Sequence, residues 1–413
     1  MSSPKIRMMF FPRERFPTSR VRLTILFNRE LVGRGHAIDL CMQAQDESVR
    51  VGRHEFGGRS VWVGATDPGS TVYHKARKHA LGIWHDLRWL WRAKADRYDC
   101  ILVSDKYFLA CVALVLARLR GLSLFFWMTF PLHEANVALG RQRLTSYPFL
   151  SRLRGHISGL ALRFVIIPFS DQLFVQSETM RENFCRQGAD PDRVTPVVTG
   201  FDPSDITPVD GRIDSSQRGP WTIAYLGTLA RERRLDVLID MLADLRRRGL
   251  TARLLLVGDG DTPRDRLYLE ELAQTLGVQD QLEITGFLPR PDALARLRDA
   301  DVCISPFHPS PILDVASPTK LVEYLALGLP VVANSHPDQS FVLRECRAGV
   351  CVPWGARYFA RAVHWLSKRS DTQLAAMGAR GRRWVEQHRS YHGIADDFER
   401  ACLQALALRT GDS

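Results

Sequence analysis

The sequence predicts an α/β protein with two successive parallel sheets. Apolar runs of strand length alternate with segments of helical periodicity along the whole chain, a pattern typical of parallel sheets covered by helices. The alternation lapses around residues 202–220, where Asp, Pro, Ser and Gly accumulate, and then begins again. The length of 413 residues fits roughly two to three domains, and a hydrophobic content of 45% suffices for their cores.

We assign a first domain to 1–205, a linker to 206–220, a second domain to 221–388 and a C-terminal helical segment to 389–413. Helices are expected over 20–33 and 76–94, and an irregular polar segment over 46–60. The expected strands of the first domain are 5–11, 36–42, 61–65, 100–105, 123–130, 172–177 and 194–200. Those of the second are 221–226, 252–257, 282–285, 302–306, 331–334 and 349–353.

The formal net charge of +11 and a pI of about 9.5 favour an anionic partner, such as a nucleotide, an acidic membrane surface or a nucleic acid. Nucleic-acid binding rests on charge alone, and a merely basic surface is the alternative. None of the eight cysteines forms a Cys-x-x-Cys pair, so we expect reduced thiols in a reducing compartment. No signal peptide or membrane-spanning stretch is recognisable, and we therefore expect a cytoplasmic protein.

The stretch from Ser317 to Asn334 predicts a short helix between two strands. Ser317 is expected to cap the helix, with Pro318 at the first helical position, where the missing N–H costs nothing. Gly328 can end the helix in a left-handed conformation. The apolar stripe of this helix consists of Leu321, Val322, Leu325 and Ala326.

The polar face of this helix begins with Thr319 and Lys320 and carries Glu323 one turn later. A lysine in the first turn opposes the helix dipole unless an anion sits there, and free N–H groups at a helix start bind phosphate. We therefore expect Thr319 and Lys320 to bind a nucleotide diphosphate, and Glu323 to accept hydrogen bonds from the ribose hydroxyls. The alternative is an ordinary amphipathic helix with a solvated polar face.

The same stretch, Ser-Pro-Thr-Lys-Leu-Val-Glu-Tyr-Leu-Ala-Leu-Gly-Leu-Pro-Val-Val-Ala, resembles the donor-binding helix of family-four glycosyltransferases. The resemblance implies the GT-B fold, with two Rossmann-like domains facing across a cleft, and a last helix that returns to the first domain. The usual signature has two glutamates eight positions apart. Glu323 matches the second, whereas Val315 stands at the first and Asp314 lies one place away. The chain is more similar to the branch that reads Ser-Pro-x-Lys-x-x-Glu-Tyr.

A second segment similar to this family runs from Tyr225 to Asp236 as a strand, a glycine turn and a basic helix start. In the family, this loop places a lysine, followed by glycine, on the donor diphosphate. Arg233 falls at the lysine position, Arg234 at the glycine position, and Arg231 is a nearby substitute. Arginine can bind two phosphate oxygens at once. The alternative is a basic helix start that faces water.

The resemblance also implies roles for residues at three further places in the chain. Gly286 and Phe287 resemble the loop that touches the base, with a simple turn as the alternative. Ser19 and Arg20 precede a helix and resemble the loop near the donor phosphates and the acceptor, with a capped helix and a solvated arginine as the alternative. His133 follows a strand where family members place a His or Asp near the reacting sugar, although a lone histidine is more often structural.

No metal site or bound cofactor is expected. The Asp-x-Asp pairs at Asp190, Asp259 and Asp299 fit turns and a helix end. The Val-Gly-Asp-Gly run that begins at Val257 lacks the third glycine of a dinucleotide fingerprint. Arginines and a helix dipole can neutralise a diphosphate leaving group without metal. The expected co-substrate is therefore a nucleotide sugar.

The sequence thus predicts a glycosyltransferase that moves a sugar from a UDP- or GDP-sugar to a lipid-linked or polysaccharide acceptor, with retention implied by the resemblance. The alternatives are a nucleotide-sugar epimerase of the same fold and a non-catalytic nucleotide-sugar-binding partner subunit. The basic helix at 76–94, with Trp84, Trp89 and Trp91, suits peripheral contact with an anionic membrane surface, or equally a core-facing aromatic stripe.

Overall fold

The structure, a computed structural model, describes residues 4–18, 20–69, 71–143, 145–209 and 219–411. The chain forms two compact units, one of Met1–Val198 with Tyr391–Ser413 and the other of Thr199–Ser390. The expected linker at 206–220 lies largely outside the described residues. Residues 199–205, which we assigned to the first domain, belong to the second unit, because Phe201 is buried in its core and donates its N–H to the Arg389 carbonyl at 2.9 Å.

The first unit contains one largely parallel sheet with the strand order β4-β5-β3-β1-β6-β7-β8-β9, and β2 pairs with β3. The expected strands are confirmed, since their apolar runs are buried on both faces. The strands are β1 (Arg7–Phe11), β2 (Arg15–Phe16), β3 (Ala37–Ala44), β4 (Gly52–Phe56), β5 (Arg59–Gly64), β6 (Cys100–Ser104), β7 (Ser123–Met128), β8 (Gln172–Val175) and β9 (Val194–Pro196).

One part of the first unit differs from the expectation. The segment 46–60, expected to be irregular, contains β4, which pairs antiparallel with β5. Gly57 and Gly58 connect the two strands with φ values of 60° and 77°. A glycine pair between two strand-like segments is the sequence signal of a two-residue hairpin turn, because both central residues of such a turn need a positive φ. The sequence analysis overlooked this pair.

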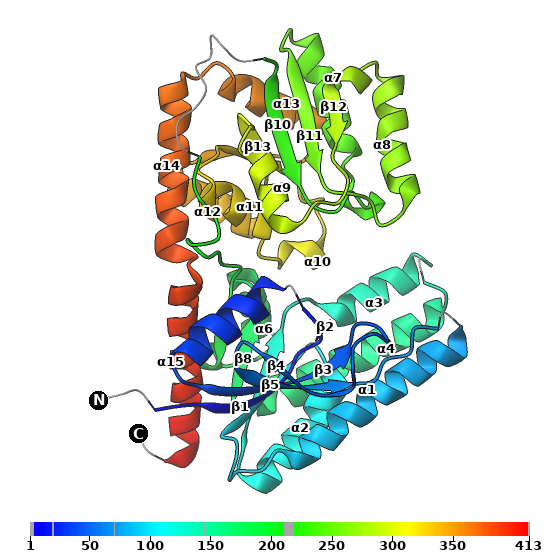
Figure 1. The fold of residues 1–413 in the computed structure, drawn as a ribbon, viewed down its shortest axis with the longest axis vertical. Coiled ribbons are helices and arrows are strands. Elements are labelled where there is room, and N and C mark those ends of the chain that lie inside the picture. The colour runs from blue at the N-terminus through cyan, green and yellow to red at the C-terminus, as the bar shows by residue number, and fades with distance from the viewer. Residues whose placement is uncertain (1–3, 19, 70, 144, 210–218, 412–413) are drawn as a thin grey trace. The chain divides into compact units, whose positions relative to one another are not determined.

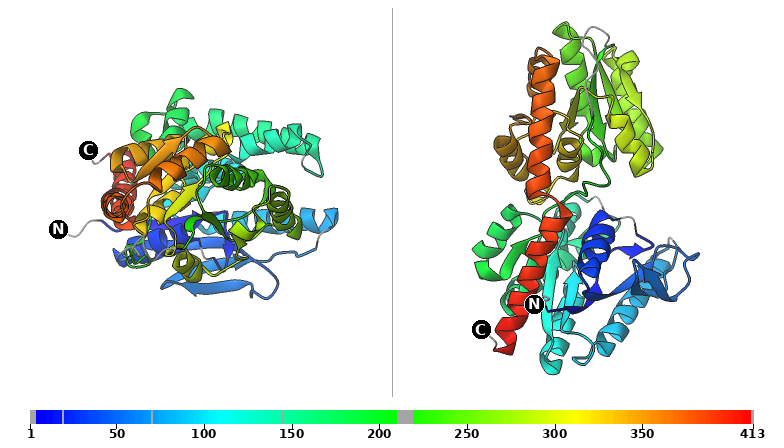
Figure 2. Two further views of the ribbon diagram at one scale, coloured as in Figure 1. Left: turned by 90° about the horizontal axis from the view of Figure 1, so that it is seen from above. Right: turned by 60° about the vertical axis from the view of Figure 1, so that its left-hand side comes forward.

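Helices cover both faces of this sheet (Figures 1 and 2). The helices of the first unit are the π-helix η1 (Arg22–Leu31), α1 (Val72–Arg92), α2 (Tyr107–Arg120), α3 (Leu132–Arg141), α4 (Pro148–Ala161), the π-helix η2 (Leu162–Ile166), α5 (Ile167–Phe169), α6 (Glu178–Arg186), the short 3-10 helix η3 (Pro191–Arg193) and α15 (Tyr391–Thr410). On α1, Trp84 and Trp91 are exposed, whereas the Trp89 ring stacks on Trp62 with centroids 3.9 Å apart.

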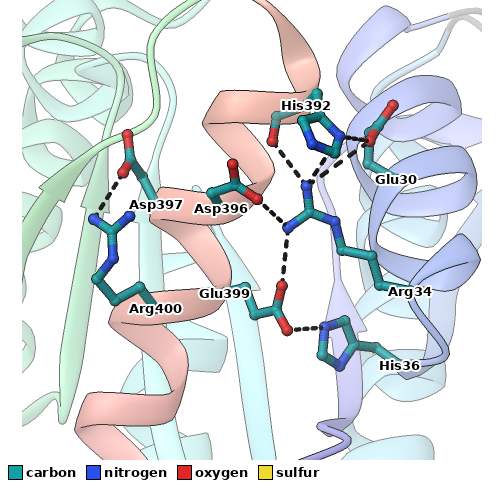
Figure 3. A network of polar contacts seen from close by, with 8 residues as sticks. All are labelled: Glu30, Arg34, His36, His392, Asp396, Asp397, Glu399 and Arg400. Atoms are coloured by element: carbon teal, nitrogen blue, oxygen red, sulfur yellow. Dashed lines mark hydrogen bonds and ion pairs between the residues drawn. The ribbon is translucent and has the colours of Figure 1, made fainter. Parts of the chain in front are cut away.

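The last helix, α15, packs against η1 and the sheet of the first unit. Its Phe398 ring stacks on Phe174 with centroids 4.3 Å apart, within a buried aromatic cluster. Polar contacts complete the docking, as Figure 3 shows: Arg34 Nη1 lies 2.6 Å from Asp396 and 2.9 Å from Glu399. Segments more than 350 residues apart in the chain are therefore joined in one core.

The second unit contains a six-stranded parallel sheet with the order β12-β11-β10-β13-β14-β15 and buried clusters on both faces. Its strands are β10 (Trp221–Leu226), β11 (Ala252–Val257), β12 (Leu282–Ile284), β13 (Val302–Ser305), β14 (Val331–Asn334) and β15 (Gly349–Val352). Its helices are η5 (Arg231–Arg233), α7 (Asp236–Arg247), α8 (Pro263–Thr275), η6 (Gln279–Gln281), α9 (Arg290–Leu297), α10 (Pro311–Asp314), α11 (Thr319–Ala326), α12 (Pro337–Cys346), α13 (Ala356–Leu366) and α14 (Asp371–His388).

Helix α11 lies between β13 and β14, as expected, and its apolar stripe is buried. Gly328 has a φ of 77° and donates its N–H to Leu325, while Leu329 donates to Tyr324, so the predicted left-handed stop is confirmed as a Schellman motif. The predicted cap is wrong. Pro318 occupies the capping position, because the Ser317 hydroxyl instead accepts from the Thr199 N–H at 3.0 Å.

Candidate functional site

The strand order of the second unit points to one edge of its sheet. After β10, the strands β11 and β12 are added on one side of it, and the chain then crosses to β13, which lies on the other side of β10. Ligands of open parallel sheets bind beyond the carboxyl ends of the strands at such a switch point. Here the switch point lies between Gly227, which follows β10, and the segment that connects β13 to α11.

Lys320 lies at this switch point. Its Nζ donates to the Tyr225 hydroxyl at 2.6 Å and lies 4.4 Å from the centre of that ring. Burial, together with the positive charge of Arg233, lowers the pKa of Lys320 to about 7. A lysine held this way gains its full charge when an anion binds beside it, so the arrangement suits a phosphate group.

Glycine backbone lines the same edge. A side chain at Gly227 would place Cβ 2.5 Å from Lys320 Cε, and one at Gly258 would place Cβ 2.1 Å from the Gly227 carbonyl oxygen. Gly227 and Gly258 have φ values of 139° and 145°, in a region that side chains rarely adopt. Gly286, with a φ of 74°, forms an isolated bridge with Gly258. Glycines therefore follow three neighbouring strands, and at Gly227 and Gly258 the Lys320 side chain and the adjoining backbone fill the space that a side chain would need.

The three arginines after β10 take different positions. Arg233 is exposed and near enough to lower the pKa of Lys320. The Arg231 guanidinium lies 4.0 Å from the centre of the Tyr268 ring. Arg234, at the family's glycine position, has a left-handed φ of 53° and pairs with Asp236 at 3.0 Å. The loop keeps the conformation that a glycine permits, and an arginine adopts it at some cost.

Glu323 lies one turn after Lys320 and is 7% exposed. Arg290, at the start of α9, donates to Glu323 Oε1 from Nε at 3.3 Å and from Nη2 at 3.1 Å. Burial raises the pKa of Glu323, while Arg290 opposes this shift. The sequence analysis missed Arg290 and Tyr225, because neither lies at a spacing that links it to α11.

The remaining predicted positions of this unit surround the edge. Phe287 is 83% exposed beside Gly286, and Thr319 is exposed at the first position of α11. Val315, at the position of the usual first glutamate, is buried at the end of α10. Asp314 precedes it in α10, and its charge acts on the buried His336.

The first unit has a polar cluster at its own switch point, between β1 and β6. Asp105 follows β6 with a φ of 56°, is buried, and accepts from the Thr129 N–H at 2.9 Å and from the Thr129 hydroxyl. Burial raises the pKa of Asp105, and the hydrogen bonds from Thr129 and the charges of Arg22 and Arg13 oppose the shift. The sequence analysis missed this aspartate, although it directly follows a buried strand.

The predicted residues of the first unit are spread around this cluster. His133, in the first turn of α3, lies with Nδ1 3.0 Å from the Tyr107 hydroxyl, and burial lowers its pKa to about 4. It is therefore neutral near pH 7 and can act as a hydrogen-bonding group or a base. Arg20 is exposed, with its N–H donating to Thr18, and its charge acts on Glu14. Ser19 lies outside the described residues.

Two absences hold for the residues that the structure describes. Among them, no group of three His, Cys, Asp or Glu side chains lies close enough together to hold a metal ion. Within the same ranges, no helix is long and apolar enough to cross a membrane.

Two family matches divide the chain in the same way as its two sheets. Residues 27–200 match the family described as "Glycosyl transferase 4-like domain", and residues 220–369 match "Glycosyl transferases group 1". Each half of the chain is therefore related to a glycosyltransferase domain. These matches support the family that the resemblance implied, whereas the branch with the Ser-Pro-x-Lys-x-x-Glu-Tyr helix and its retention of configuration stay predictions.

The curated relatives are similar over about half of the chain or less. A protein of Escherichia coli K12 named as a putative colanic acid biosynthesis glycosyltransferase, WcaL, is 29% identical over 189 residues, which are 45% of this chain and 46% of WcaL. The amylovoran biosynthesis glycosyltransferase AmsK of Erwinia amylovora is 26% identical over 44% of this chain and 45% of its own length. The matches thus span less than half the length of these relatives.

Solved structures resemble this chain over nearly all of its length. Sucrose-phosphate synthase of Thermosynechococcus elongatus has a TM-score of 0.74 at 15% identity, with 97% of this chain and 99% of that one covered. Anabaena HepE in complex with UDP has a TM-score of 0.66 at 16% identity, with 97% and 100% covered. At such identities the likeness establishes the GT-B fold alone.

Proposed function

We propose that this protein is a glycosyltransferase that moves a sugar from a nucleotide diphosphate to a glycan or lipid-linked acceptor, with retention of configuration. The observation that carries the proposal is Lys320, partly buried beside Arg233 at the switch point, where its side chain lies against the bare backbone of Gly227. Two cations and bare backbone suit a diphosphate better than a neutral ligand.

In the proposed reaction, the bond between the anomeric carbon and the diphosphate oxygen breaks, and the acceptor oxygen forms the new bond on the same face. The acceptor proton passes to the departing phosphate oxygen, so the charges balance without a protein nucleophile. Lys320, Arg233 and the start of α11 at Thr319 would stabilise the negative charge that develops on the leaving group. Arg231 is a further cation of the same loop.

We assign Glu323 to the ribose of the donor. Both hydrogen bonds from Arg290 reach Oε1, so Oε2 can accept from a ribose hydroxyl. Arg290 supports this role because it favours the ionised form of a buried carboxyl. Gly286 and Phe287 would receive the base, since an exposed aromatic ring beside bare backbone offers a stacking surface.

The donor is either a UDP-sugar or a GDP-sugar. HepE was solved with UDP and with UDP-glucose, whereas a Mycobacterium tuberculosis relative, 31% identical over 40% of this chain, is named as GDP-mannose-dependent. In the first unit, Arg20 and the neutral His133 are assigned to the acceptor or the reacting sugar. No metal is required in this proposal, because the cations named above carry the leaving-group charge.

A second candidate is a non-catalytic subunit that binds a nucleotide sugar. Val315 favours it, because a buried valine cannot replace the hydrogen bonds of the usual glutamate. A nucleotide-sugar epimerase of the same fold is the alternative that needs no acceptor. Calorimetry with UDP- and GDP-sugars, followed by turnover with and without a lipid extract, separates the three. Acceptor-dependent transfer supports the proposal, epimerised sugar without acceptor supports the epimerase, and tight binding without any turnover supports the subunit.

A further inference from the structure

Helix α4 presents its large apolar side chains to solvent. The exposed fractions of these side chains run from 44% to 72%. At 100° per residue, the members between 149 and 160 fall within about 100° of one another around the helix axis. We call this surface the α4 face, and it consists of Phe149, Leu150, Leu153, Ile157 and Leu160, continued by Phe164 in η2.

The other side of α4 packs on α3 through small residues. A Cβ at Gly155 would lie 2.6 Å from the His133 carbonyl oxygen, and one at Gly140 would lie 2.6 Å from that of Pro148. The two helices approach so closely because these positions carry no side chain. In a surface helix of a soluble protein the large apolar residues normally face the core. In α4 this arrangement is reversed, and a large exposed apolar surface marks an interaction site.

A neighbouring helix also exposes apolar side chains. Helix α2 contacts both α4 and η2, and its Phe108, Val115 and Leu119 are exposed. Their spacing of seven and four residues places them on one side of α2 as well. Exposed apolar side chains therefore occur on more than one helix of this unit.

The charged residues of the segment that carries the α4 face have one sign. Between Glu134 and Asp171 the sequence contains five arginines and no acidic residue. Three of them, Arg152, Arg154 and Arg163, lie in α4 and η2 and are exposed. Aliphatic and aromatic side chains with arginines beside them match a bilayer interface, where apolar groups enter the acyl region and cations meet anionic headgroups.

We propose that the α4 face docks the protein on an anionic lipid bilayer. Large apolar side chains project from this exposed helix surface, so the surface suits a lipid bilayer, whose acyl chains can surround them. The uniform positive charge favours anionic lipid over a second copy of this chain, which would bring the same arginines into contact. This inference does not depend on the proposed reaction, because a protein of any activity could dock on a bilayer through this face.

The test is flotation of the purified full chain with vesicles of phosphatidylcholine alone or with 30% phosphatidylglycerol, at low and high salt. The chain should float with the anionic vesicles at low salt and bind neutral vesicles much less. Phe149→Ser/Leu153→Ser should weaken binding about tenfold to a hundredfold, because two apolar side chains are lost from the interface. Arg152→Gln/Arg154→Gln should weaken binding about tenfold or more at low salt and little at high salt.

Two matched variants test the location. Leu267→Ser/Phe341→Ser removes two exposed apolar side chains from the second unit, and Trp84→Ser/Trp91→Ser removes the two exposed tryptophans of α1. The former should bind like the wild type. The proposal is overturned if the wild type fails to float, if the α4 variant binds vesicles as the wild type does, or if sedimentation shows that the α4 face holds a dimer and the protein binds no vesicles. Circular dichroism and thermal unfolding must show that the variants fold.

Discussion

Replacement of Lys320 by methionine tests the diphosphate site most directly. The lysine has a pKa of about 7 in the free protein, and an anion at Nζ favours its charged form. The pKa of Lys320 therefore rises when a diphosphate binds. The contribution of Lys320 to affinity is present below about pH 7, and it decreases by up to tenfold per pH unit as the pH rises above this value.

The magnitude of the loss follows from the type of contact. A hydrogen bond to a charged group contributes about 1.5–3 kcal/mol, so Lys320→Met should weaken UDP or GDP roughly tenfold to 150-fold at pH 6.5. Binding of uridine or guanosine should not change, because neither carries a phosphate. The variant should also lose the pH dependence of diphosphate binding above pH 7. Calorimetric titration at pH 6.5, 7.5 and 8.5 measures all three effects.

The free energy of unfolding provides an independent check. The folded pKa of Lys320 lies below that of an unfolded lysine, so the unfolded chain binds more protons between about pH 7 and 10. In this range the stability of the wild type should rise with pH relative to Lys320→Met, by at most about 1.4 kcal/mol per pH unit, and by less because the side chain is partly exposed.

The control for Lys320→Met is Lys368→Met, which removes an exposed lysine from the same unit. It should leave both the affinity and its pH dependence unchanged. Equal losses for nucleoside and diphosphate, or a wild-type affinity that is independent of pH between 6.5 and 8.5, would refute the reasoning.

Three further predictions concern the donor, the metal and the core. Glu323→Ala should weaken nucleosides and their diphosphates alike, by about one to two decades in calorimetric titration, and a loss confined to the diphosphates would contradict a ribose contact. Sugar transfer should persist in EDTA, whereas a complete loss restored by manganese would contradict a metal-free reaction. Phe398→Ala should lower the free energy of unfolding by about 3–5 kcal/mol in urea denaturation, because the side chain is 1% exposed among aromatic rings, and a loss below 1 kcal/mol would contradict this packing of α15.

The elements of this protein could be predicted because they depend on neighbouring residues. The left-handed stop at Gly328 needs only a glycine after an apolar helical stripe. The buried parallel strands appear as apolar runs for the same reason, since each one is covered on both faces. The turn at Gly57 and Gly58 was equally local, and attention to the glycine pair would have predicted β4.

The family resemblance located α11 as the candidate site, but the sequence could not assign the partners of its residues. The Lys320 Nζ meets a tyrosine hydroxyl 95 residues away, and Glu323 meets an arginine 33 residues earlier. Ser317 had the right chemistry to cap α11, yet its hydroxyl accepts from a backbone N–H 118 residues away.

The sequence by itself determined which segments become strands and helices and where α11 ends, because local propensity and the period of the apolar pattern suffice for these. Only the tertiary structure decided that Lys320 has a lowered pKa, that Glu323 is paired, and that α4 turns its apolar side chains outward. The lowered pKa of Lys320 and the pairing of Glu323 depend on burial and on charges that meet where β13 lies beside β10. The outward apolar side of α4 depends on the close approach of α3 and α4. Such distances arise from chain topology, which no local pattern encodes.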